Sequence, residues 1–206
     1  MRAFLAAPTW QSRGKHVINP ASVLPLMEKH AATHGEGPID TISIQLLEVA
    51  GASHIFKVCT PNIPTGFPVA VILTDTGPQI DWESFLGFHD DHFRTFLEGP
   101  DKAEGTFDLL VKPEPETPED ATSHFLRYRL SVPMPDRDVV AWVRKDSDTL
   151  AKLRAIFSGS GGLDAATVNR LGETGVPLAL RLAKRETNDG RSFVEVDGIV
   201  SLGWAP

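Results

Sequence analysis

The sequence predicts an α+β protein with a curved, mostly antiparallel sheet of about six to eight strands. Segments with alternating apolar residues follow one another through short connections, and short connections favour antiparallel pairing. Residues 81–97 place apolar side chains on one half of a long amphipathic helix, which we expect to pack on the sheet. We expect a single domain over residues 1–206, with N-terminal helices in 1–38 and the sheet with its long helix in 39–206.

The N-terminal part of the chain predicts short helices followed by a longer one. Residues 2–7 form the first of them. The longer helix has two possible starts, at Asn19 or at Ser22. Ser22 fits better, because Pro25 has no N–H to donate and belongs in a first helical turn. We expect this helix to end near Gly35.

Strands are predicted on both sides of the helix at 81–97. In the first of them, the pair Leu46-Leu47 breaks the alternation, which indicates either a bulge or a strand buried on both faces. The turn at Asn188-Asp189-Gly190 predicts a tight hairpin between the last two strands. The predicted strands cover residues 41–49, 54–60, 67–73, 106–112, 124–132, 138–144, 177–184 and 192–196, and two further helices cover 147–157 and 164–171.

The composition is that of an acidic globular protein, with 41% hydrophobic residues and a net charge of −7. This balance argues against nucleic acids and anionic membrane surfaces as partners, because both are recognised by basic patches. No apolar run approaches the ~20 residues that cross a bilayer, so we expect no membrane insertion. The single cysteine, Cys59, favours a reducing compartment such as the cytoplasm, unless the chain is a piece of an anchored protein.

Three segments, at residues 4–10, 19–27 and 80–85, resemble an uncharacterised bacterial family of soluble domains of similar length. Because that family has no assigned activity, the resemblance implies no catalytic residue. The order of elements is also similar to the nuclear-transport-factor-2-like (NTF2-like, cystatin-related) cone, in which a long helix packs on a curved sheet. The chain departs from that cone by an extra strand before the long helix and an extra helix before the last two strands.

The most suggestive polar cluster is His89-Asp90-Asp91-His92. A histidine beside a carboxylate can act as a general base, because imidazole titrates near neutral pH and the carboxylate fixes its tautomer. On the helix predicted over 81–97, however, the two aspartates lie on the polar face and both histidines on the apolar face. A carboxylate for His89 would then come from another element. We interpret His89 first as a hydrogen-bonded residue in or near the core, second as a pocket residue and third as a base.

The other candidate sites are incomplete. His30 and His34 have the four-residue spacing of two metal ligands on one helical turn, but zinc needs three or four ligands and we find no third one nearby. We therefore expect no metal site. The glycine-rich segment 158–162 lacks the lysine of a phosphate-binding loop. Cys59 has no histidine within sequence reach, which favours an inert thiol. We expect no cofactor.

These observations leave two classes of function. The first is a non-enzymatic binding domain that takes a protein partner or forms a homo-oligomer, since no convergent set of polar residues points to catalysis. The alternative is a cone-like domain with a pocket for a small apolar ligand, lined by Trp82, Phe85, His89 and His92. One of the two histidines would then support weak hydrolase or isomerase chemistry. A large cavity reached by His89 or His92 would favour the alternative, and a filled core the first class.

Overall fold

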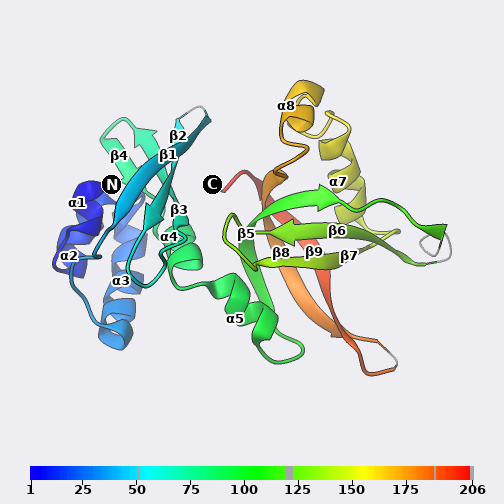
Figure 1. The fold of residues 1–206 in the computed structure, drawn as a ribbon, viewed down its shortest axis with the longest axis horizontal. Coiled ribbons are helices and arrows are strands. Elements are labelled where there is room, and N and C mark those ends of the chain that lie inside the picture. Colours follow the sequence, from blue (N-terminus) through cyan, green and yellow to red (C-terminus); the bar gives the residue numbers. More distant parts are fainter. Residues whose placement is uncertain (51, 119–122, 188, 205–206) are drawn as a thin grey trace. The chain divides into compact units, whose positions relative to one another are not determined.

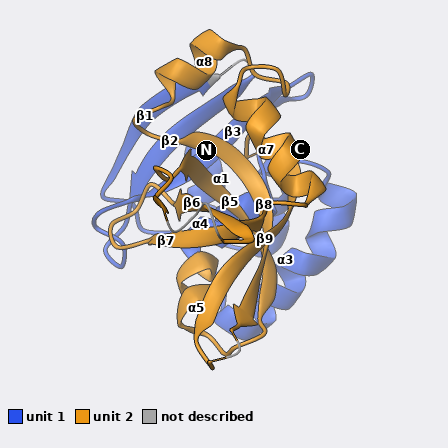
Figure 2. Ribbon diagram, turned by 90° about the vertical axis from the view of Figure 1, so that its right-hand side faces the viewer, with its two compact units in different colours: residues 1–90, 205 blue, residues 91–204, 206 orange. Residues whose placement is uncertain are grey.

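The strands of this protein form two sheets. The structure, a computed structural model, describes residues 1–50, 52–118, 123–187 and 189–204. It confirms the α+β class with mostly antiparallel strands, arranged as a four-stranded sheet and a closed five-stranded barrel (Figure 1). The sequence predicted one sheet in one domain, whereas the chain divides into two compact units: unit 1, residues 1–90, and unit 2, residues 91–204 (Figure 2).

The boundary between the two units in the sequence falls where the predicted long helix is broken. Helix α4 covers Trp82–His89 and helix α5 covers His92–Glu98. Asp90 ends α4, and Asp91 has a left-handed backbone with φ of 53°, through which a right-handed helix does not continue. The prediction of one continuous helix over 81–97 is therefore wrong.

Unit 1 contains the N-terminal helices and the four-stranded sheet. Helix α3 begins at Pro20 with Asn19 as its N-cap, so the preferred start at Ser22 is wrong and Pro25 lies inside the helix. Proline is favourable at the first helical position, which explains this start. The elements are α1 (Arg2–Leu5), α2 (Trp10–Arg13), the 3-10 turn η1 (Gly14–His16), α3 (Pro20–His34), β1 (Ser43–Ala50), β2 (Ser53–Cys59), β3 (Phe67–Thr74) and β4 (Gly77–Ile80).

The four strands pair antiparallel in chain order, and one face of their sheet carries the core of unit 1. On β3, Phe67, Val69 and Val71 are buried and alternate along the strand. Helix α4 packs on this strand. The register between β1 and β2 shifts between Leu46 and Glu48, which confirms the bulge and not the doubly buried strand.

Unit 2 is built round the closed barrel, whose strand order is β5-β6-β7-β9-β8. Neighbours pair antiparallel except β7 and β9, which are parallel where Ala141 lies opposite Val194. Strands β8 and β9 form the predicted hairpin, although Asn188 lies outside the described residues. Besides α5, the elements are β5 (Glu104–Pro113), β6 (Phe125–Ser131), β7 (Asp138–Arg144), α7 (Asp148–Phe157), α8 (Ala165–Arg170), β8 (Val176–Glu186) and β9 (Ser192–Leu202).

In the part of the chain that the structure describes, none of the helices combines the length and the apolar character needed to cross a bilayer.

Candidate functional site

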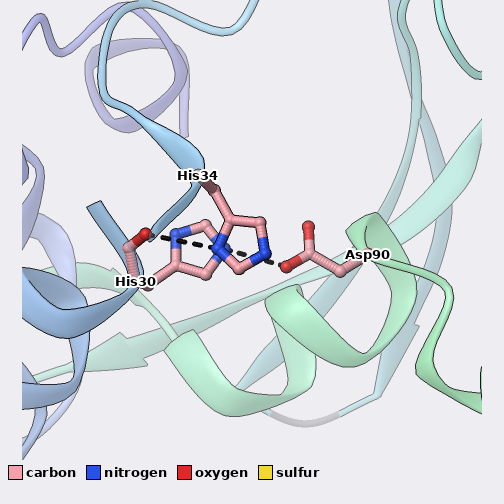
Figure 3. Close-up of side chains that lie close together, drawn as sticks. All are labelled: His30, His34 and Asp90. Carbon is pink, nitrogen blue, oxygen red and sulfur yellow. Dashed lines mark hydrogen bonds and ion pairs between the residues drawn. The ribbon is translucent and has the colours of Figure 1, made fainter. Parts of the chain in front are cut away.

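Two histidines and an aspartate of unit 1 meet at the C-terminal ends of α3 and α4 (Figure 3). His30 and His34 lie on the last turns of α3, and their rings stack with centroids 4.4 Å apart. Oδ2 of Asp90 lies 2.8 Å from Nε2 of His30. One potential ligand atom of each of the three residues lies within 4.8 Å of the others. Asp90, which follows His30 by sixty positions, is therefore a potential third ligand beside the two histidines.

Asp90 also contacts its own neighbour. Its Oδ1 lies 2.6 Å from Nδ1 of His89. The expectation that the carboxylate beside His89 must come from another element is wrong, because it assumed a continuous helix. Since α4 ends at His89, Asp90 is a cap residue that is not held on the polar face of a helix. One carboxylate thus accepts hydrogen bonds from both His30 and His89.

The hydrogen bonds fix where these imidazoles carry their protons. An ionised carboxylate only accepts, so Nε2 of His30 and Nδ1 of His89 are the protonated nitrogens facing Asp90. Nδ1 of His34 lies 3.2 Å from the carbonyl oxygen of His30, which also only accepts. In the neutral form of His34, the proton is therefore on Nδ1 and the lone pair on Nε2 is left for another partner.

The electrostatics of the cluster favour an ionised Asp90. Burial alone would raise the pKa of this carboxyl, but the hydrogen bonds from His89 and His30, together with their positive charges, outweigh it and lower the pKa to about 2. The side chains of His30 and Asp90 are 20% and 21% exposed, so solvent screens the cluster only partly.

This pKa predicts a pH-dependent contribution to stability. The ordinary pKa of the carboxyl is 3.8, and the folded value is lower, so the contribution is present above that pH and is lost as the pH falls toward 2. Its full size is about 2 kcal/mol. We expect the difference in unfolding free energy between wild type and Asp90→Asn to shrink by about 1 kcal/mol between about pH 5 and about pH 3 in urea denaturation. Parallel profiles for the two proteins would contradict this assignment.

The four residues predicted to line a pocket have different environments. Trp82 and Phe85 are each 2% exposed and belong to the core of unit 1. Phe85 stacks on Trp82 at 5.6 Å and on His89 at 5.2 Å between ring centroids. His89 is a partly exposed residue at the edge of this aromatic core, with its side chain 31% exposed. His92 begins α5 in unit 2 and is exposed. Trp82 and Phe85 are thus packed side chains of the core of unit 1, and His89 lies at its edge.

A pocket of about 210 Å³ is present in unit 2, away in sequence from those four residues. Its lining mixes charges of both signs with the ring of Tyr128. The pKa of this phenol is raised above its ordinary value, mainly by burial. The charge of Arg154 opposes the shift, and the charge of Glu116 adds to it. The pocket therefore offers a neutral phenol between opposing charges, and not the apolar enclosure that the alternative function requires.

A second candidate site is an apolar surface on unit 1, which we call the apolar strip. Its members are the exposed large apolar residues of the four-stranded sheet and of the position that leads into it. They are 49–64% exposed: Ile42, Leu46, Leu47, Val49 and Leu73.

The pairing register shows which face of the sheet carries two members of the strip, Leu46 and Val49. Leu46 lies opposite Phe56, which lies opposite the buried Val69, so Leu46 faces the same side as the core. In the same way, Val49 lies opposite His54, and His54 lies opposite the buried Val71, so Val49 also faces the same side as the core. Helix α4 packs on β3, and the apolar face continues onto β1, where its side chains are exposed. The sequence shows that these residues are apolar but not that their side chains are exposed.

The comparisons with known proteins add no relative: no family model matches the chain, and no curated protein matches it.

Proposed function

We propose that this chain is a non-enzymatic assembly protein that forms a homodimer through the apolar strip. The observation that supports this proposal is the strip itself, in which large apolar side chains on and beside one sheet are about half exposed or more. Burying apolar surface is favourable by roughly 25 cal/mol per Å², and contiguous exposed apolar patches mark interaction surfaces.

The position of the strip supports an interface. Strand β1 is an edge strand of the open sheet. Edge strands are usually protected by lysines, prolines or several charges, but β1 carries Glu48 as its one charged residue. The bulge at Leu46 and Leu47 interrupts regular pairing along the edge, which favours packing on the face of the strand over addition of a further strand.

The chemistry of the strip favours a second copy of the chain as its occupant. Homodimer interfaces are richer in apolar surface than transient ones and poor in charge, as this strip is. In a two-fold symmetric dimer the same patch contacts itself, and two strips without charged members meet without opposing like charges. The net charge of −7 on each copy opposes association over a longer range. Salt should therefore strengthen the dimer by screening this repulsion.

Sedimentation equilibrium of the full chain tests the proposal. We expect a monomer–dimer equilibrium that shifts toward the dimer with protein concentration and with salt. A lysine in place of Leu46 or Val49 should weaken the dimer by at least about tenfold, because a charge would then be buried in the interface. Both side chains are about half exposed, so the variants should keep their fold, which circular dichroism checks.

The matched control is Val200→Lys, which places the same charge on a residue 59% exposed in unit 2, outside the strip. We expect this variant to dimerise like wild type. A wild-type chain that stays monomeric at every concentration would overturn the homodimer and leave an apolar segment of another protein as the occupant. Equal dimerisation of Val49→Lys and wild type would show that the strip is not the interface.

A further inference from the structure

The cluster of His30, His34 and Asp90 has the composition and spacing of a metal site. We propose that these three side chains bind one divalent transition-metal ion, with zinc as the ion that fits best. Two imidazoles and a carboxylate form a common ligand set for zinc. This inference is independent of the proposed dimer, because it concerns the ends of α3 and α4 and not the apolar strip.

The distances suit a single ion after small side-chain movements. Zinc binds imidazole nitrogen at about 2.0–2.1 Å and carboxylate oxygen at about 2.0–2.2 Å, so neighbouring ligands of a tetrahedral ion lie roughly 3.3 Å apart. Nε2 of His30 and Oδ2 of Asp90 are 2.8 Å apart, and all three ligand atoms lie within 4.8 Å of one another. To bind one ion, the first distance must lengthen slightly, and any of the other two distances that is close to 4.8 Å must shorten.

The surrounding hydrogen bonds orient the ligands. Ligating histidines commonly donate their other N–H to a backbone carbonyl or a carboxylate. His34 does this already, because its Nδ1 donates to the carbonyl oxygen of His30 and leaves Nε2 as the ligand atom. Asp90 has Oδ1 bonded to His89, which directs Oδ2 toward the ion. Only His30 must change, by moving the proton that faces Asp90 from Nε2 to Nδ1.

The degree of burial fits an open site. The side chains of His30 and Asp90 are about one-fifth exposed and His34 is exposed, so an ion can enter from solvent. The buried ring of Trp82 lies roughly perpendicular to that of His30, at 5.5 Å between ring centroids. Three protein ligands leave one tetrahedral position for water or a small anion.

The competing explanation is an ion pair between His30 and Asp90 that joins α3 to α4 without any metal. His34 separates the two explanations, because its imidazole is a required ligand in the first and only a stacked neighbour in the second. His34→Ala is also a mild variant, since the side chain it removes is exposed. Asp90→Asn removes the anionic ligand and keeps the shape of the side chain.

Isothermal titration calorimetry with zinc chloride, on the full chain purified without a histidine tag, tests the site. We expect one zinc per chain for wild type, and binding weaker by at least about tenfold for both His34→Ala and Asp90→Asn. The matched control is His92→Ala, which removes an exposed histidine outside the cluster and should leave zinc binding unchanged. Titration with cobalt(II), followed by its visible absorption, should give the same order among the variants.

Three results would overturn the site. The first is the lack of stoichiometric zinc binding by wild type. The second is a His34→Ala variant that binds zinc as tightly as wild type, which would reduce the cluster to an ion pair. The third is a loss of zinc binding in His92→Ala equal to that in His34→Ala, which would assign the binding to scattered surface histidines.

Discussion

Replacing Phe85 with alanine is expected to lower the free energy of unfolding by about 3–5 kcal/mol. Its ring is 2% exposed and contacts several rings of unit 1. The ring of Phe4 lies edge-on at 4.9 Å, that of Phe67 at 6.0 Å, and those of Trp82 and His89 stack on it. Alanine leaves a cavity among these rings, because rings on separate helices and strands cannot all move inward to fill it.

Urea denaturation measures this loss, and peptide-resolved hydrogen exchange assigns it to unit 1. Phe85→Leu keeps most of the volume and should cost less than about 1.5 kcal/mol. Leu26→Ala, at a side chain 46% exposed, is the surface control and should change stability by less than about 1 kcal/mol. A cost for Phe85→Ala no larger than that of the surface control would show that these rings do not form the core of unit 1.

Replacing Arg13 with methionine is expected to cost about 2–4 kcal/mol of stability. This buried arginine, 8% exposed, donates to three backbone carbonyls. Its Nε lies 3.2 Å from the carbonyl oxygen of Phe4, and its Nη2 lies 3.2 Å from that of Ala7 and 2.5 Å from that of Gly37. The guanidinium also lies over the ring of Phe4, at 5.5 Å from its centroid. Methionine keeps the apolar stem but leaves these carbonyl oxygens without their donor.

Arg13→Lys separates charge from geometry, because one ammonium cannot reproduce the planar fork of a guanidinium. We expect it to be nearly as destabilising as Arg13→Met. Arg2→Met removes an exposed arginine from the neighbouring helix and should cost less than about 0.5 kcal/mol. Chemical denaturation of the three variants against wild type gives the values. Equal stability of Arg13→Met and Arg2→Met would mean that the three carbonyl oxygens accept hydrogen bonds from water in place of the guanidinium.

Local sequence signals predicted the individual elements well. Alternating apolar residues marked β3, where Phe67, Val69 and Val71 are buried in turn. A helix was predicted over 147–157, and the hydroxyl of Ser147 accepts a hydrogen bond from the backbone N–H of Leu150 at the start of α7. Such signals depend on residues close together in the sequence, so they predict an element whatever its tertiary surroundings are.

The break in the long helix was not predictable from the apolar pattern. Both halves bury aromatic residues, Phe85 in α4 and Phe93 in α5, at a spacing that a continuous helix would also satisfy. The left-handed conformation of Asp91 is tolerated by aspartate but not encoded by it. Arg137 of unit 2 holds the Asp91 carboxylate through Nε at 2.8 Å, a contact that no local pattern reveals.

The same limit applies to the candidate site and to the sheets. The spacing of His30 and His34 and the cluster at His89 were both visible in the sequence, but their meeting at Asp90 depends on the packing of α3 beside the end of α4. Strand β4, at Gly77–Ile80, was missed because glycine and proline favour a turn. The division into two sheets depends on which strands pair, and alternation within one strand says nothing of its neighbour.

The way the barrel closes has a consequence for how the chain folds during synthesis. In unit 1 each strand pairs with the next one along the chain, so its contacts are local. In unit 2, Glu104 of β5 pairs with Ala183 of β8, and Trp142 of β7 pairs with Glu195 of β9. Pairing strands that are so far apart in the sequence closes long loops, which costs conformational entropy. These pairs also cannot form until the C-terminal strands have left the ribosome. Unit 1 can therefore complete its sheet first, and the apolar strip is then available to a chaperone or to another nascent copy while the barrel is still open.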